Sequence, residues 1–145
     1  MKKLALLLTT TFVACQLHAA DVGWLTDLPK ALEQAKAEKK LVLIDFTGSD
    51  WCPPCKNLHK TVLTAPEFVA FAKANLVLVD IDFPNSKPQS AELKAANKAL
   101  AKQFGVTGYP TVVVLDASGK ELFKKVGYGG TPAKTYVADL EKLKK

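Results

Sequence analysis

Apolar residues recur along this chain in two spacings that predict alternating helices and strands. Spacing of three to four residues predicts helical segments over 28–39, 55–63, 67–74, 91–104 and 131–143. Short runs rich in Val, Leu and Ile predict strands over 41–46, 76–83, 111–115 and 121–126. Helices between the early strands favour parallel pairing, whereas the last two strands form a hairpin. The pattern therefore predicts an α/β fold, with a mixed central sheet and helices on both faces.

Two details of this pattern bear on packing. On the helix over 91–104, we expect one buried side made of Leu93, Ala96, Leu100 and Phe104. The segment Gly127-Tyr128-Gly129-Gly130 resembles a phosphate-binding loop only in its glycines, and its position predicts a connector between the last strand and the last helix.

The first residues follow a different pattern from the rest. Two lysines precede an apolar run over residues 4–13, and small residues follow up to Ala20. This order is typical of a secretory signal peptide, and the run is shorter than the roughly 20 residues that cross a bilayer. We expect a signal peptide over 1–20 and one mature domain over 21–145.

A second route of processing stays open. Phe12-Val13-Ala14-Cys15 resembles a bacterial lipobox, in which Cys15 would become a lipidated N-terminus. Both routes predict export, to the periplasm or another compartment outside the cytoplasm.

The charge of the chain and its single domain limit the kinds of binding partner that we expect. All 20 basic residues are lysines, and the 18 that follow the signal peptide stand against 14 acidic residues, which leaves a charge of +4. Without arginine the chain lacks the bidentate fork that suits phosphate, so we expect no nucleic-acid binding. There is no internal repeat and no second domain in the pattern, and we expect a monomer.

Only Cys52 and Cys55 remain after the signal peptide. A structural disulfide gains most from closing a long loop, and this loop is nearly as short as possible, which favours redox chemistry. A zinc site needs four ligands, and His59 is the only histidine after the signal peptide. A c-type haem site needs histidine directly after the second cysteine, where Lys56 stands. We therefore expect no metal and no cofactor other than a redox-active disulfide.

The motif Trp51-Cys52-Pro53-Pro54-Cys55 follows a predicted strand and opens a predicted helix. At a helix N-terminus, backbone N–H groups and the helix dipole favour a thiolate on Cys52, the species that attacks disulfides. Cys55 lies one turn further, is expected to be more buried, and can resolve the mixed disulfide. His59, four residues beyond, is expected to be a surface side chain.

A second motif, Gly108-Tyr109-Pro110-Thr111, precedes the third predicted strand. Together with the Trp-Cys-x-x-Cys motif it resembles the thioredoxin family over about residues 25–145, which implies the thioredoxin fold. The resemblance implies that Pro110 is cis and packs against the disulfide. It also implies that the Tyr109 backbone pairs with the substrate chain and that Trp51 belongs to the substrate surface.

The family also has a buried acid on the strand before the motif. Asp45 interrupts the apolar run over 41–44 and is the candidate, although the approach over 47–50 is one residue longer than in thioredoxin. A buried carboxylate has a raised pKa and could accept the proton of the resolving thiol. Asp80 and Asp82 alternate on a later strand, but with no third acid expected nearby we do not predict a metal site.

Residues 46–51 further resemble exported disulfide reductases of the DsbH type and of the C-terminal domain of DsbD. This implies an enzyme that reduces protein disulfides and a membrane electron donor of the DsbD type. A net oxidant or isomerase, or a non-catalytic thioredoxin-fold binding module, remain as alternatives.

Overall fold

A computed structural model describes residues 22–144 of the chain. Its strands are β1 (Trp24–Leu25), β2 (Leu41–Thr47), β3 (Leu76–Asp82), β4 (Thr111–Leu115) and β5 (Glu121–Val126). Its helical segments are α1 (Leu28–Glu38), α2 (Pro53–Leu58), the π-helical turn η1 (His59–Leu63), α3 (Pro66–Asn75), α4 (Ala91–Gln103) and α5 (Ala133–Glu141). The expected signal peptide and Cys15 lie outside the described residues. Within residues 22–144, no helix is long and apolar enough to cross a membrane.

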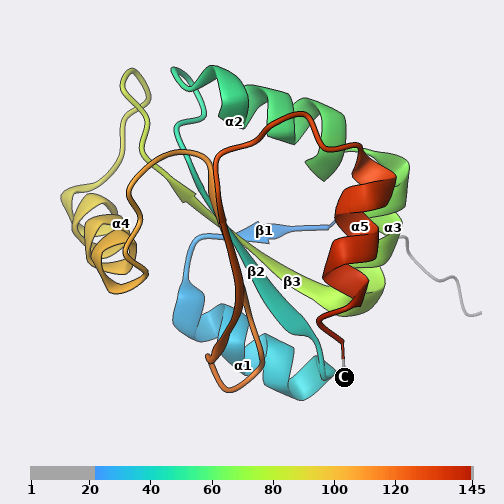
Figure 1. Cartoon of the computed structure of the whole chain (residues 1–145). Coiled ribbons are helices and arrows are strands. Elements are labelled where there is room, and N and C mark those ends of the chain that lie inside the picture. The colour runs from blue at the N-terminus through green and yellow to red at the C-terminus, as the bar shows by residue number, and fades with distance from the viewer. Residues whose placement is uncertain (1–21, 145) are drawn as a thin grey trace, which may run out of the picture.

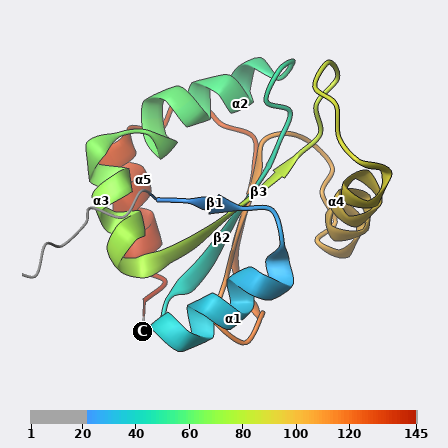
Figure 2. The same cartoon turned by 180° about the vertical axis from the view of Figure 1, so that it is seen from behind.

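The strands form one mixed sheet in the order β1-β3-β2-β4-β5. β3 pairs in parallel with β1 and β2, and β4 pairs antiparallel with β2 and β5. The short strand β1 forms one edge of the sheet, and in Figure 2 it lies in front of β2 and β3. The redox motif follows β2, so it extends from a central strand with neighbours on both sides.

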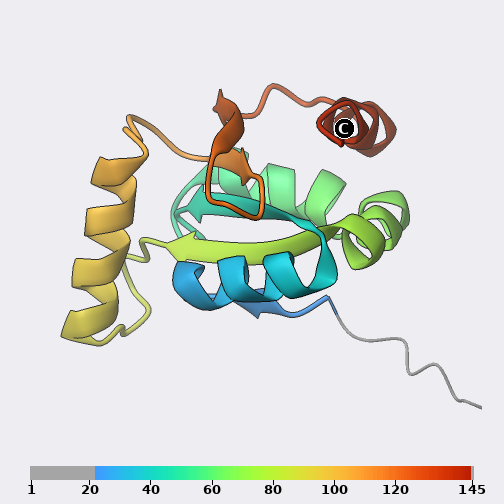
Figure 3. The same cartoon turned by 90° about the horizontal axis from the view of Figure 1, so that it is seen from below.

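Helices cover both faces of this sheet, as the sequence predicts (Figure 1). One apolar cluster joins Leu43 of β2 to side chains of α2, η1, α3 and α5. The other joins Ile44 of β2 to α1 and to Phe104 at the end of α4. Figure 1 shows α1 and α4 on the opposite side of the sheet from α2 and α5, and in Figure 3 α4 and α5 lie at opposite ends of the view. Because strand residues alternate between faces, Asp45 lies on the face covered by α2 and η1.

The predicted fold class is confirmed, and both strands of the late hairpin have the predicted bounds. Asp116 closes that hairpin, since its carboxylate accepts hydrogen bonds from the backbone N–H of Ser118 at 2.8 Å and of Lys120 at 3.1 Å. The segment over 127–130 connects β5 to α5, also as predicted. The short strand β1 was not predicted, because two residues are too few to show a pattern.

Two helical predictions are corrected. Ala96 is exposed, because α4 is rotated so that Asn97 faces inward and donates a hydrogen bond of 2.9 Å to the Asp82 carbonyl. The helix predicted over 55–63 begins at Pro53 and ends in the π-helical turn, where the Thr64 N–H donates to the His59 carbonyl at 3.1 Å. Proline suits the first turn of a helix because its missing N–H has no partner there.

Candidate active site

Cys52 and Cys55 form a disulfide at the start of α2, with Cα atoms 5.3 Å apart. Cys52 is the N-cap residue of the helix, and its Sγ accepts a hydrogen bond from the Cys55 N–H at 3.3 Å. The same donor would stabilise a Cys52 thiolate, because hydrogen bonds to charged acceptors are stronger. Cys52 therefore lies at the N-terminus of a helix, as the sequence predicts.

The expected difference in burial between the cysteines is absent. Cys52 is 3% exposed and Cys55 is 2% exposed. The disulfide and the hydrogen bond from Cys55 fold the Cys52 side chain back onto the first helical turn, which accounts for its burial.

The Trp51 side chain lies beside the disulfide turn and is 42% exposed. Its Nε1–H donates to the Phe83 carbonyl at 2.7 Å. The indole also covers Gly48, where a Cβ would lie 2.7 Å from two atoms of the ring. Glycine is therefore required at this place in the loop for Trp51 to keep its position.

The loop before the motif is fastened to the loop after β3. The Asp50 carboxylate accepts hydrogen bonds from the backbone N–H of Asn85 at 3.0 Å and of Ser86 at 2.7 Å. The Asp82 carboxylate accepts two more from Ser49, through its N–H at 2.9 Å and its hydroxyl at 2.5 Å. These contacts hold the loop that leads to Trp51.

The segment over 108–111 comes to the same end of the sheet. The Tyr109–Pro110 peptide bond is cis, and Pro110 is buried. The Tyr109 ring meets the Trp51 indole edge-on with centroids 5.8 Å apart, and it contacts Phe83 at 5.2 Å. Three aromatic side chains from three different loops thus gather next to the redox turn.

Asp45 is buried on the face of the sheet that α2 and η1 cover, with 4% exposure. No donor among residues 22–144 reaches its Oδ1 atom. Burial raises its pKa to about 8, and the negative charges of Asp80 and Asp82 add to this shift. The carboxyl group is therefore neutral in the folded protein at pH 7, so it can donate a proton inside the molecule and must lose that proton before it can accept one.

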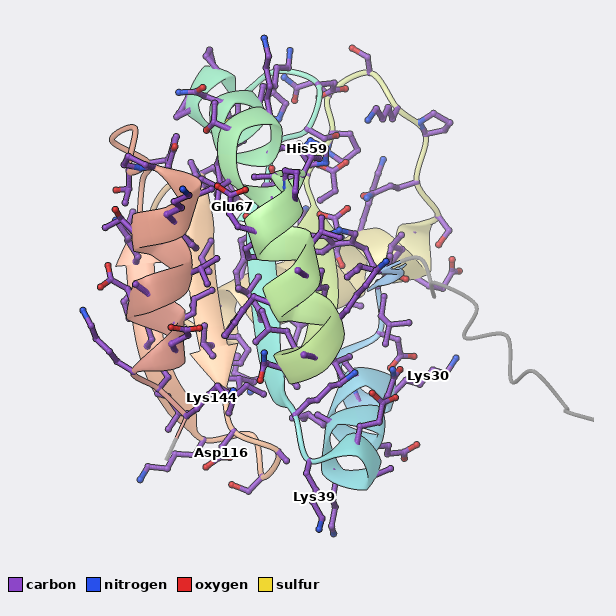
Figure 4. The ribbon with its side chains drawn as sticks, turned by 90° about the vertical axis from the view of Figure 1, so that its right-hand side faces the viewer. Lys30, Lys39, His59, Glu67, Asp116 and Lys144 are labelled. Atoms are coloured by element: carbon purple, nitrogen blue, oxygen red, sulfur yellow. A yellow bond between two sulfur atoms is a disulfide. The ribbon has the colours of Figure 1, made fainter. Side chains whose placement is uncertain are left out.

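A cavity of about 450 Å³ lies on this face. Three aspartates, Asp45, Asp80 and Asp82, line it together with His59. Figure 4 labels His59 on the helical segment over this side of the sheet, and its side chain is exposed as predicted. The prediction that no third acid lies near Asp80 and Asp82 is wrong, because β2 places Asp45 opposite Asp80. The acids nevertheless do not gather into a metal site, since the described part of the chain has no group of three ligands suited to a metal ion.

Residues 28–144 match the family described as Thioredoxin-like domain. The "Disulfide bond reductase DsbH" of Chlamydia pneumoniae is 36% identical over 123 residues, which cover 85% of this chain and 73% of that protein. The chain belongs to the thioredoxin-like family. A solved structure of "DsbH Oxidoreductase" agrees, with a TM-score of 0.79 and 32% identity over 96% of this chain and 93% of that one.

A longer relative is the "Thiol:disulfide interchange protein DsbD" of Cronobacter sakazakii, 37% identical over 109 residues. That match covers 74% of this chain and 17% of DsbD, so the chain spans about a sixth of that relative. With the disulfide between Cys52 and Cys55, these matches identify the thioredoxin-like chain as a thiol–disulfide oxidoreductase of the DsbH and DsbD type.

Two features of this thioredoxin-like site were missed in the sequence. The sequence pattern predicts Phe83 only as the end of a strand, although its ring contacts Tyr109 and its carbonyl accepts a hydrogen bond from Trp51. The sequence pattern raises Asp80 only as a possible metal ligand, although its side chain shares a cavity with Asp45. The acidic alternation on the strand was the available signal for Asp80, but its relation to Asp45 depends on strand register.

Proposed function

We propose that this protein reduces disulfides of exported proteins through the Cys52 and Cys55 dithiol. The disulfide at the N-terminus of α2 carries the proposal, since that place favours the attacking thiolate. The direction of electron flow, from the enzyme to the substrate, is supported by the relative named disulfide bond reductase, of which the chain covers 73%.

In this reaction the Cys52 thiolate attacks a sulfur of the substrate disulfide. A mixed disulfide forms, and the other substrate sulfur leaves as a thiolate that takes a proton from solvent. The Cys55 thiolate then attacks Cys52 Sγ, the mixed disulfide breaks, and the second substrate thiol is released. Two electrons pass from the enzyme dithiol to the substrate disulfide, and a donor dithiol must later reduce the enzyme.

Four neighbouring residues have roles in this proposal. Asp45 takes the proton of the Cys55 thiol after it has lost its own proton to solvent, and its burial on the α2 face supports this role. Trp51 and Tyr109 form the apolar part of the substrate surface, and the substrate backbone pairs beside the cis Pro110. The roles follow the family resemblance, and the aromatic contacts beside the redox turn support them.

The N-terminal sequence supports a cellular location for this protein, and the relatives support a redox partner. We propose export by the signal peptide over 1–20, or anchoring through Cys15, and reduction of the enzyme by a membrane donor of the DsbD type. The mass of the mature protein tests the first point, because an unmodified N-terminus at residue 20 or 21 excludes a lipid on Cys15.

Reduction of insulin disulfides with dithiothreitol tests the activity. The wild-type chain should accelerate insulin precipitation, and Cys52→Ser should lower the rate to that of dithiothreitol alone. If wild-type protein and Cys52→Ser give the same rate, the reductase proposal is wrong and a non-catalytic binding module takes its place.

A further inference from the structure

Asp45 and Asp80 stand on adjacent strands of the sheet, on the α2 face. β2 and β3 pair in parallel with Asp45 opposite Asp80, and the next residues on this face are Thr47 and Asp82. Neighbouring strands lie about 4.8 Å apart, so carboxyl groups in register on one face are close. Asp45 is buried, whereas Asp80 is partly exposed. The pair therefore runs from the interior of the molecule toward its surface.

The cavity joins this pair to solvent. Its volume of about 450 Å³ is enough for several water molecules, each of which occupies roughly 30 Å³ in the liquid. The unpartnered Oδ1 of Asp45 belongs to a side chain that lines this cavity. Asp45 and Asp80 thus line one cavity that is large enough to hold water.

Other charged groups around the pair come from every neighbouring element. The further lining groups that titrate or carry charge are Lys56 of α2, His59 of η1, Asp82 of β3 and Lys87 of the loop after β3. From α5, the buried Tyr136 faces Asp45, whose charge contributes to the raised pKa of the phenol after burial itself. Asp82 is engaged by Ser49, and the Lys56 amine donates to the Asp50 carbonyl at 2.8 Å. Asp80 is in register with Asp45, and among residues 22–144 its carboxylate has no salt bridge.

We propose that Asp80 is a positioning residue for the disulfide exchange, which with Asp45 forms a carboxyl pair that holds one proton and exchanges it with solvent through the cavity. This inference rests on the proposed function, because it assigns the proton of Cys55 to Asp45. Burial, together with the charge of Asp82, raises the pKa of Asp80 to about 6, below the value of about 8 for Asp45. At pH 7 the shared proton therefore lies on Asp45, and Asp80 carries the charge.

The proton count balances in both half-reactions. When a donor dithiol opens the Cys52–Cys55 bond, Cys55 leaves as a thiolate and takes the proton of Asp45. Asp45 is then an anion beside the Asp80 anion, and their repulsion draws a proton from solvent. When the enzyme reduces its substrate, Asp45 must first lose its proton through Asp80 and can then accept the proton of Cys55. The only electron carriers are the donor dithiol and the substrate disulfide.

Titration of the aspartate carboxyl carbons by NMR in the full oxidised chain tests the pair. The Asp45 midpoint should fall by about one pH unit in Asp80→Asn, because the nearest like charge is removed. Asp80→Glu should return the midpoint toward the wild-type value. Asp139→Asn is the matched control, since it removes one exposed carboxylate that pairs with Lys142 and lies outside the cavity. The pH at which insulin reduction is half-maximal should move in the same direction as the Asp45 midpoint.

An Asp45 midpoint that is unchanged in Asp80→Asn overturns the proposal, and so does an equal shift in Asp139→Asn. If Asp80→Asn does not fold by circular dichroism, Asp80→Ser replaces it, with the same two outcomes. The titration needs no turnover, so it decides the carboxyl pair even if the wild-type chain fails to reduce insulin. A shifted midpoint with an unchanged pH profile of an active enzyme would contradict the part of the proposal that concerns exchange.

Discussion

Replacing Asp45 with asparagine should make the protein more stable at alkaline pH. The pKa of Asp45 is about 8 in the folded protein, against 3.8 for an ordinary aspartate. Between these values the carboxyl is neutral when folded and ionised when unfolded, so unfolding releases a proton and rising pH favours unfolding. Stability from this group is complete below about pH 4 and is lost as pH rises through 8. Asparagine keeps the size of the side chain and carries no charge to bury.

The size of the effect follows from the pKa difference. About 4 units separate the two values, and each unit corresponds to about 1.4 kcal/mol, so the effect is of order 5 kcal/mol between pH 4 and 8. This is a large part of the 5–15 kcal/mol that stabilises a typical domain.

Urea unfolding of the oxidised protein at several pH values measures this effect. The free energy of unfolding of Asp45→Asn minus that of the wild type should rise steadily from pH 5 to pH 8 and level off above it. The exposed Asp139→Asn serves as control and should give a flat difference over this range, because Asp139, with its lowered pKa, is ionised throughout. Parallel stability curves for Asp45→Asn and the wild type would refute the reasoning.

The remaining predictions concern the redox turn and its loop. Cys55→Ser should trap substrates as mixed disulfides on Cys52 that dithiothreitol releases; a variant that traps no more than a Cys52→Ser control would contradict the order of attack. Gly48→Ala should displace the Trp51 indole, and the indole N–H signal in NMR should move toward that of a solvent-exposed indole; an unmoved signal would contradict the close contact. Asp82→Ala should lower the free energy of unfolding by about 1–3 kcal/mol, because it leaves the N–H and hydroxyl donors of Ser49 without their partner. Unchanged urea unfolding would show that these hydrogen bonds do not stabilise the fold.

The sequence was sufficient for most elements because their patterns are local. The hairpin is the clearest case: an apolar run over 111–115 is followed by Asp116, whose side chain bonds the turn, and both strands have their predicted bounds. The place of Cys52 at a helix N-terminus is local in the same sense, since a strand precedes it and two prolines follow.

Features that depend on the fit of distant segments could not be derived in the same way. The inward face of α4 is set by the bond from Asn97 to the end of β3, and periodicity alone favoured Ala96. The position of Asp45 opposite Asp80 depends on the register of β2 against β3, which no spacing within either strand reveals. A shift by one residue would send every side chain of a strand to the opposite face.

The equilibrium of the Cys52–Cys55 pair with dithiothreitol or glutathione buffers at pH 7 tests the central claim most directly. Thiol alkylation and mass spectrometry give the reduced fraction in each buffer. A protein reductase should have a potential near that of thioredoxin, about −270 mV. A potential near −120 mV, the range of strong disulfide oxidants, would contradict the account and reverse the direction of electron flow.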